Sequence, residues 1–413
     1  MSPASPTRSR GRLVAALAAL AIAAATLSPA PSQVAEAART PIWCVLCGDL
    51  GTVDVLLNLL LFVPLGLALR AAGFPVARAT LLAAGFSLAI ELLQLGIPGR
   101  DTSLSDFLTN TAGAALGAWL AGTWRAWVFA PPRLARRLAL GMTLAWLAQT
   151  ALTAYAVLPA LPRSVYWGQI APDLEQFERF RGEVLSGRVG PIPMASRRLE
   201  NSAEVRRVLL DSGAVGAVAV PDGPTPGLAP IVSVFDREQR EIVLLGQAGR
   251  DLVFRIRSHA FDLRLRPPAI RVPGAFPEGE GDTLRLAGRL SGRTLEAEAR
   301  GSGPARRGAL DLSAQWGWSL VLPMRYYLGP GERWLTALWI AGWLVPVGYW
   351  TRRSRAASAG LAAALFGVGL GLVAIPAGFG LRAPGAWEWL AAAIGILIGW
   401  WAGFRPKTAG ATD

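Results

Sequence analysis

Three apolar stretches of this chain carry polar residues at helical spacing: NLLLFVPLG at residues 58–66, SLAIELLQ at 87–94 and DFLTNTAG at 106–113. Each lies in an apolar run of about 18 residues or more, which is long enough for a helix to cross a bilayer core of roughly 30 Å. A carboxylate or amide inside such a helix costs free energy and normally faces a partner or a water-filled space. The three stretches therefore predict membrane helices that meet at a polar cluster.

The composition of the whole chain is that of a membrane protein. Of the 413 residues, 52% are hydrophobic and 17% are charged, whereas an ordinary soluble domain has roughly 25% charged residues. The net charge of +13 would favour nucleic-acid binding in a soluble protein, but in a hydrophobic chain it first concerns membrane topology. Two cysteines and one histidine leave little room for a Cys/His metal site, so we expect no metal and no cofactor.

Eight apolar stretches predict a multi-pass α-helical membrane protein with an inserted all-β domain. The first stretch follows three arginines and ends in small residues, so a cleaved signal peptide is the alternative to a retained anchor. We expect the anchor to be retained. The predicted spans are residues 13–30, 53–70, 76–97, 107–124, 138–160, 334–350, 358–380 and 386–404.

The basic residues predict the orientation of these spans. With the N-terminus in the cytoplasm, the short outer pieces hold three cations, Arg39, Arg100 and Arg382, while the cytoplasmic pieces hold fourteen. This asymmetry is typical of proteins that follow the positive-inside rule. It predicts a membrane protein with both termini in the cytoplasm, residues 161–333 outside, and no nucleic-acid partner. The cytoplasmic set is Arg8, Arg10, Arg12, Arg70, Arg78, Arg125, Arg133, Arg136, Arg137, Arg352, Arg353, Arg355, Arg405 and Lys407.

Residues 161–333 differ from the rest of the chain in composition and pattern. They hold 24 arginines against 20 acidic residues, a net charge of +4. Short alternating runs separated by turn signals predict an all-β sandwich or jelly roll. Ser291-Gly292-Arg293 predicts a hairpin turn. The predicted strands are Ala217–Val220, Ile231–Phe235, Glu241–Gly246, Asp251–Ser258, Phe261–Arg266, Thr283–Arg289 and Leu295–Arg300.

The polar residues of the second to fourth spans gather near the predicted outer face. Ser87, Glu91 and Gln94 are four and three residues apart and share one helix face. We predict a ligand-binding cluster in which Arg100 pairs with Glu91 or Asp106; structural alternatives are a helix cap at Asp106 and an interhelical pair of Glu91. The predicted cluster is Asn58, Ser87, Glu91, Gln94, Arg100, Asp101, Asp106 and Asn110. Small residues at Gly113 and Gly117 would let their helix approach a neighbour closely.

These residues resemble the VanZ-like family of bacterial membrane proteins. The matching pieces are Asn58 to Gly66, Ser87 to Gln94, Arg100-Asp101 and Asp106 to Gly113, followed by Gly117. The resemblance covers residues 49–122 and implies a membrane unit of the cell envelope, linked to glycopeptide antibiotic sensitivity. The usual family member is small, whereas here a large insert and three further helices follow.

The insert resembles a concanavalin A-type or laminin-G-type jelly roll. The residues that carry this likeness are Ile231–Asp236, Leu244–Gln247 and Asp251–Arg257. Such domains often bind glycans and some hydrolyse them. Hydrolysis needs two carboxylates that flank the glycosidic bond. Glu296 and Glu298 lie on the same strand face, and no third acid is in register with them. Binding is therefore favoured over hydrolysis.

The other candidate residues lie outside these two regions. Cys44 and Cys47 precede the second span on the predicted outer side and predict a disulfide, with incidental thiols or a redox or metal role as the alternatives. The only histidine, His259, is expected at the surface. Trp316 and Trp318 could stack on a sugar ring.

Together these features predict a non-enzymatic protein that binds an envelope glycan or lipid-linked precursor at the outer leaflet of the bilayer. The alternative is an intramembrane enzyme that uses Glu91 as acid or base on a lipid-linked phosphate or sugar. The oligomeric state is not predicted. The expected parts are an N-terminal helix and linker (1–48), a VanZ-like unit (49–124), a fifth helix (125–160), the jelly roll (161–333), three C-terminal helices (334–404) and a cytoplasmic tail (405–413).

Overall fold

The computed structural model describes residues 6–30, 41–46, 48–100, 102–174, 177–211, 213–279, 281–324 and 331–404. The chain forms two compact units. The first is Met1–Leu138 with Arg353–Arg355, and the second is Ala139–Arg352 with Ala356–Asp413.

Helices occupy all eight stretches that the sequence predicts. Among the described residues, five helical segments are long and apolar enough to cross a membrane, which indicates a membrane protein: α1, α3, α4, α6 and the run through α11 and α12. The span count of eight is not confirmed, because α5, α10 and the 17-residue α13 fall outside that group. The bounds are α1 (Pro6–Thr26), α3 (Gly51–Ala71), α4 (Val76–Gln94), α5 (Leu104–Val128), α6 (Pro132–Ala156), α10 (Glu332–Arg353), α11 (Ala357–Gly369), α12 (Ile375–Gly378) and α13 (Ala386–Ala402).

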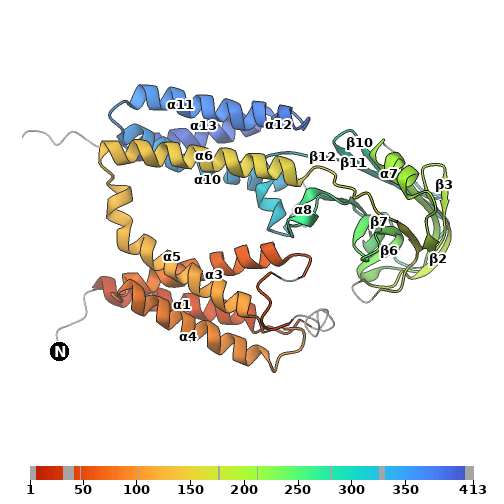
Figure 1. The fold of residues 1–413 in the computed structure, drawn as a ribbon, viewed down its shortest axis with the longest axis horizontal. Helices are drawn as coiled ribbons and strands as arrows, with labels where there is room; N and C mark the ends of the chain where they lie inside the picture. The colour runs from red at the N-terminus through yellow and green to blue at the C-terminus, as the bar shows by residue number, and fades with distance from the viewer. Residues whose placement is uncertain are drawn as a thin grey trace, which may run out of the picture. The chain divides into compact units, whose positions relative to one another are not determined.

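In the first unit, helices α1, α3, α4 and α5 lie side by side (Figure 1). Each contributes to one apolar core, so α1 is an integral part of the unit. The core consists of Ala15, Ile22, Phe62, Leu65, Ala68, Ala83, Ile90 and Ala114.

Helices α3 and α5 make backbone contact through glycines. A Cβ added at Gly113 would lie 2.1 Å from the carbonyl oxygen of Leu59, and one added at Gly117 would lie 2.1 Å from that of Val63. Both pairs advance by four residues, so α3 and α5 run parallel. Only glycine permits this approach, as the small-residue spacing predicts.

The end of α1 is held by residues at the end of α4 and in the loop that follows. Gln94 and Arg100 donate side-chain hydrogen bonds to carbonyl oxygens in the last turn of α1 and just beyond it. The bonds are Gln94 Nε2 to Thr26 O at 3.0 Å, Arg100 Nε to Ser28 O at 2.7 Å and Arg100 Nη2 to Ala25 O at 3.1 Å. These donors satisfy carbonyls that a helix end leaves without intrahelical partners.

The second unit contains two six-stranded antiparallel sheets, with strand orders β4-β1-β6-β7-β8-β9 and β12-β11-β10-β5-β2-β3. The sheets form the green part of Figure 1. The predicted all-β domain is thus confirmed, although a jelly-roll identity is not. The strands are β1 (Trp167–Ile170), β2 (Gly182–Val189), β3 (Ile192–Met194), β4 (Arg197–Arg198), β5 (Val215–Pro221), β6 (Thr225–Phe235), β7 (Glu241–Gly249), β8 (Asp251–Ile256), β9 (Ala269–Val272), β10 (Leu284–Ser291), β11 (Thr294–Arg300) and β12 (Arg306–Asp311).

Most predicted strands of the insert are present, but one is wrong. Residues 261–266 do not form a strand: the short helix α8 (His259–Asp262) is followed by a turn in which Arg264 has a φ of 53°. The predicted hairpin at Ser291–Arg293 is present, because Ser291 pairs with Thr294 across a turn where Gly292 has a φ of 62°.

The helices of the second unit share a core with one another and bond to the end of the sandwich. Trp146 of α6 packs with side chains of α10, α11 and α13. Gln315 Nε2 donates to Gly371 O at 3.1 Å, and Trp318 Nε1 donates to Thr336 Oγ1 at 2.9 Å. Trp316 and Trp318 are both buried, so the alternative that they stack on a sugar is wrong.

The glycine contact between α3 and α5 predicts a sharp stability difference between two alanine variants. Gly117→Ala places a methyl group against the Val63 carbonyl, and we expect it to lower the free energy of unfolding by about 1–3 kcal/mol. Gly85→Ala on α4 meets no atom within 4 Å and is expected to raise it by up to about 1 kcal/mol. Thermal unfolding of both detergent-purified variants tests this ranking, and equal losses would contradict it.

The contacts of α1 predict that this helix remains in the mature protein. Its removal would uncover the apolar core and leave Gln94 and Arg100 without their carbonyl partners. Intact-mass measurement on protein purified from membranes should therefore give a chain that includes α1. A mature chain beginning after Ala30 would show that the helix is a cleaved signal peptide.

Candidate functional site

Six buried polar side chains lie at one end of the first unit. This end is formed by the start of α5, the last turns of α4 and the end of α1, which the hydrogen bonds below bring together. Polar groups in such surroundings cost free energy unless they are hydrogen-bonded, so their partners decide what the cluster does. The six residues are Ser87, Glu91, Gln94, Ser103, Ser105 and Asn110.

Two side-chain hydrogen bonds join α4 to the start of α5. Asn110 Nδ2 donates to Ser87 Oγ at 3.0 Å, and the backbone N–H of Ser103 donates to Glu91 Oε2 at 2.9 Å. Ser103 is also the N-cap of α5, and its Oγ accepts from Ser105 N at 3.1 Å. Glu91 therefore holds the capping residue of α5 in position.

Two oxygen atoms of the cluster have no hydrogen-bond partner among the described residues. They are Gln94 Oε1 and Asn110 Oδ1, and both are buried. The orientation of the Gln94 amide is fixed, because its Nε2 faces the Thr26 carbonyl and only a donor fits there. These two oxygens are therefore buried acceptors that the described residues leave without a donor.

The predicted ion pair of Arg100 with Glu91 or Asp106 is wrong. The Arg100 guanidinium instead donates to the carbonyls of Ala25 and Ser28. The C-terminal end of a helix carries partial negative charge, which favours a cation there. The cluster is thus left without Arg100 as a direct ligand for an anion.

The remaining predicted residues lie nearby or outside the described chain. Asn58 is half-buried on α3 and makes no side-chain hydrogen bond to the described residues, while Asp106 is half-buried in the first turn of α5. Asp101 lies outside the described residues. Cys44 is disulfide-bonded, but Cys47 lies outside the described residues too, so its pairing with Cys44 stays a prediction.

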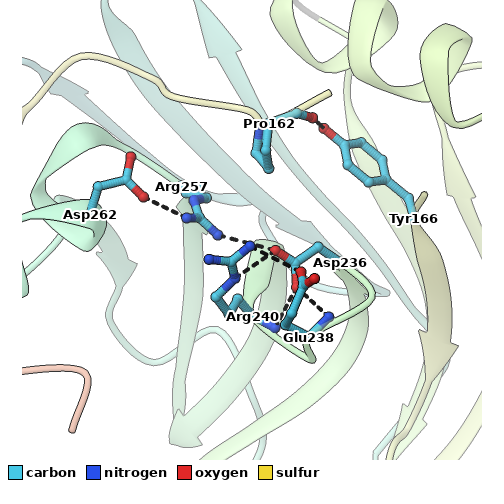
Figure 2. Close-up of polar contacts among 7 residues, drawn as sticks. All are labelled: Pro162, Tyr166, Asp236, Glu238, Arg240, Arg257 and Asp262. Atoms are coloured by element: carbon cyan, nitrogen blue, oxygen red, sulfur yellow. Dashed lines mark hydrogen bonds and ion pairs between the residues drawn. The ribbon is translucent and has the colours of Figure 1, made fainter. Parts of the chain in front are cut away.

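A second polar cluster, which the sequence analysis missed, lies at one end of a sandwich sheet. Figure 2 shows Asp236, just after β6, between Arg240 and Arg257. The buried Asp236 carboxylate accepts the backbone N–H groups of Glu238 and Arg240 at 3.0 and 2.9 Å. Arg257 is buried as well and lies 2.5 Å from Asp262 and 3.6 Å from Asp236. Asp236 and Arg257 come from different strand ends, so no local spacing connects them.

Residues beside this second cluster hold the segment that follows α6. The carbonyl of Arg257 accepts from Ala160 N at 3.0 Å, and the Tyr166 hydroxyl donates to Pro162 O at 2.7 Å (Figure 2). Burial raises the pKa of Tyr166 to about 12, so the hydroxyl keeps its proton and remains a donor. His259 stacks on Tyr155 of α6 with 4.1 Å between ring centroids, and it is half-buried rather than a free surface residue. These contacts are structural, because they attach α6 and the segment after it to the sandwich.

The two strand carboxylates considered for glycan hydrolysis are paired with arginines. Glu296 bonds to Arg289, and Glu298 bonds to Arg300 and Arg307. The hydrogen bond from Arg300 lowers the pKa of Glu298, which opposes a role as proton donor. In the described part of the chain, no group of three or more His, Cys, Asp or Glu side chains could hold a metal ion.

The bond between Glu91 and Ser103 predicts different effects for two substitutions. Glu91→Ala leaves the buried N–H of Ser103 without its acceptor, which should cost about 1–3 kcal/mol of unfolding free energy. Glu91→Gln keeps an oxygen that can accept and should lose less. Chemical unfolding in detergent compares them, with Leu92→Ala as a control because Leu92 is exposed on the same helix turn. If both Glu91 variants were as stable as the unsubstituted protein, the structural role would be excluded.

Comparison with known proteins gives one match. The family model described as VanZ/LLP1 matches residues 12–125, which reaches from α1 into α5 and so extends beyond the predicted resemblance at 49–122. Neither a curated protein nor a solved structure matches the chain. This protein is therefore a membrane protein whose residues 12–125 are similar to the VanZ/LLP1 family.

Proposed function

We propose that this protein acts in the bacterial cell envelope, where its VanZ-like unit binds the head group of a lipid-linked glycan without catalysing a reaction. The observation that carries the proposal is the pair of buried oxygens, Gln94 Oε1 and Asn110 Oδ1, that lack a donor. An unsatisfied buried acceptor costs free energy, and the hydroxyls of a sugar head group would supply the missing donors. Both side chains belong to the buried polar cluster that also contains Glu91.

The proposed topology has this polar end at the outer leaflet of the cytoplasmic membrane. The distribution of arginines supports both termini in the cytoplasm and residues 161–333 outside. A head group in the outer leaflet would then meet the polar end of the helices directly. The second unit would recognise the glycan portion of an envelope polymer, and altered glycopeptide sensitivity is the expected cellular consequence of losing the protein.

Binding is favoured over the alternative that Glu91 acts as acid or base on a lipid-linked phosphate or sugar. A catalytic carboxylate must be free to reach the proton that it transfers, whereas Glu91 Oε2 accepts the backbone N–H of Ser103 and so holds the start of α5. Arg100, which would orient a phosphate, donates to the end of α1 instead. Both facts favour a neutral, donor-rich ligand over a phosphate.

The test uses the full chain in nanodiscs of phosphatidylcholine that contain either monoglucosyldiacylglycerol or phosphatidic acid. Native mass spectrometry should show that the glucolipid is retained in preference to phosphatidic acid. Asn110→Leu, which removes the acceptor oxygen, should lose this preference, and Asn110→Asp should keep it. Thr111→Val is the matched control, because the Thr111 hydroxyl bonds only within its own helix, to Phe107 O.

Three results would count against the proposal. Retention of neither lipid above phosphatidylcholine excludes head-group binding by the first unit. Preferential retention of phosphatidic acid would instead support the phosphate chemistry of the enzymatic alternative. Equal loss of the glucolipid in Asn110→Leu and Thr111→Val would show that the effect does not come from the Asn110 acceptor.

A further inference from the structure

The end of the first unit that lies opposite the buried polar cluster is cationic. Helices α1 and α4 begin there, and α3 and α5 end there. Two glycine contacts show this arrangement: a Cβ added at Gly11 would lie 2.5 Å from Ala72 N, and one added at Gly122 would lie 3.7 Å from the Val76 side chain. We call this the basic end, because it holds all the arginines of the four helices. They are Arg8, Arg10, Arg12, Arg70, Arg78 and Arg125.

No acidic residue in the described part of the first unit lies at the basic end. The described acids lie at the start of α3, in the last turns of α4 and in the first turn of α5; they are Asp49, Asp54, Glu91 and Asp106. A helix of about 20 residues is roughly 30 Å long, which is well beyond the Debye length of about 8 Å at physiological salt. These carboxylates therefore do not neutralise the arginines.

Three of these arginines pack around the turn between α3 and α4. The Arg8 side chain of α1 lies along this turn, since a Cβ added at Gly73 would lie 3.2 Å from Arg8 Nε. The Arg70 side chain reaches across to α5, since a Cβ added at Gly122 would lie 3.3 Å from Arg70 Nε. Arg125 follows Gly122 by three residues and so lies on the same face of α5. Guanidinium groups from three helices thus gather beside one turn.

The packing of Arg70 goes beyond what membrane topology requires. The positive-inside rule needs cations on one side of the membrane, but it does not need them packed between helices. Arg70 is half-buried, and its Nε is buried without a hydrogen-bond partner among the described residues. Its terminal nitrogens are the part of the group that reaches the surface, where Arg8 and Arg125 are both exposed. A partly buried charge without a counterion costs free energy, which an anion bound at the surface would offset.

The position of the basic end determines which anion is available there. Arg8 is the first residue of the apolar run of α1, and Arg70 lies in the last turn of the apolar helix α3. Residues at the ends of membrane helices lie at the level of the lipid head groups. Guanidinium groups bind phosphate through paired hydrogen bonds, and basic pockets between membrane helices bind phospholipid head groups. A phospholipid phosphate is therefore the anion that the basic end meets.

We infer that Arg8, Arg70 and Arg125 bind the head group of a phospholipid that has two phosphodiester groups, as cardiolipin does. One phosphodiester carries a single negative charge and would leave most of the three cations unpaired. Two phosphates joined by a short linker can reach guanidinium groups of different helices. The inference goes beyond the proposed function, because it concerns the opposite end of the unit and a ligand that offers acceptors instead of donors.

The test uses the full chain in phosphatidylcholine nanodiscs that contain either cardiolipin or phosphatidylglycerol, which has one phosphodiester, at equal phosphate content. Native mass spectrometry should show that cardiolipin is retained in preference to phosphatidylglycerol. Arg70→Gln and Arg125→Gln should each lower cardiolipin retention about fivefold, as expected for the loss of one cation near a head group. Because Arg125 is exposed, its variant tests the site even if Arg70→Gln folds poorly.

Arg10→Gln is the matched control. Arg10 is exposed and follows Arg8 by two residues, so it lies on a different face of α1, and its loss should leave retention unchanged. Asn110→Leu at the polar end should also leave cardiolipin retention unchanged, which separates this site from the proposed glycolipid site.

Three outcomes would overturn the inference. Equal retention of cardiolipin and phosphatidylglycerol would show that the basic end does not select a lipid with two phosphates. Equal losses in Arg10→Gln and Arg70→Gln would show that the arginines act only as diffuse surface charge. Displacement of cardiolipin by excess inorganic pyrophosphate would show that the ligand is a soluble anion instead of a lipid.

Discussion

The buried hydrogen bonds between α4 and α5 determine how the polar end of the first unit is built. A carboxylate or amide in apolar surroundings is stable only with a partner. Glu91 has one in the backbone N–H of Ser103, and Asn110 has one in Ser87. These bonds set the start of α5 against the last turns of α4. Because α5 starts at this position, Gly113 lies level with Leu59 of α3, and the two backbones come into contact. The hydrogen bonds of the buried polar groups and the packing of α5 against α3 thus both depend on residues 103–113.

The sequence alone predicted the members of this polar cluster that lie on one helix. Ser87, Glu91 and Gln94 share a face because of their spacing, and the structure buries all three. The partner of Arg100 was not predictable in the same way. Arg100 donates to carbonyls that lie 72 and 75 residues earlier in the chain. Every helix end offers such carbonyls whatever its sequence, so no residue pattern marks that contact.

The same difference between local patterns and long-range contacts explains which strands of the sandwich could be predicted from the sequence. Short apolar runs between turn signals identified the long central strands such as β7, which is buried along almost its whole length. The sequence pattern could not identify β4, which has two residues. It mistook 261–266 for a strand because Phe261, Leu263 and Leu265 alternate with polar residues, although the chain forms a helical turn there. The sequence also could not show which tryptophans are exposed. Trp316 is buried and Trp167 is exposed, and this difference depends only on how each side chain packs.

The two ends of the first unit offer different chemistry to a ligand. The polar end offers amide oxygens that need donors, with Arg100 engaged elsewhere. The basic end offers guanidinium groups from three helices. A phosphate group carries acceptors at neutral pH, so it suits the basic end and would leave the oxygens of the polar end unpaired. A saccharide has hydroxyls that donate. For this reason a saccharide is the ligand class that we propose for the polar end of this protein.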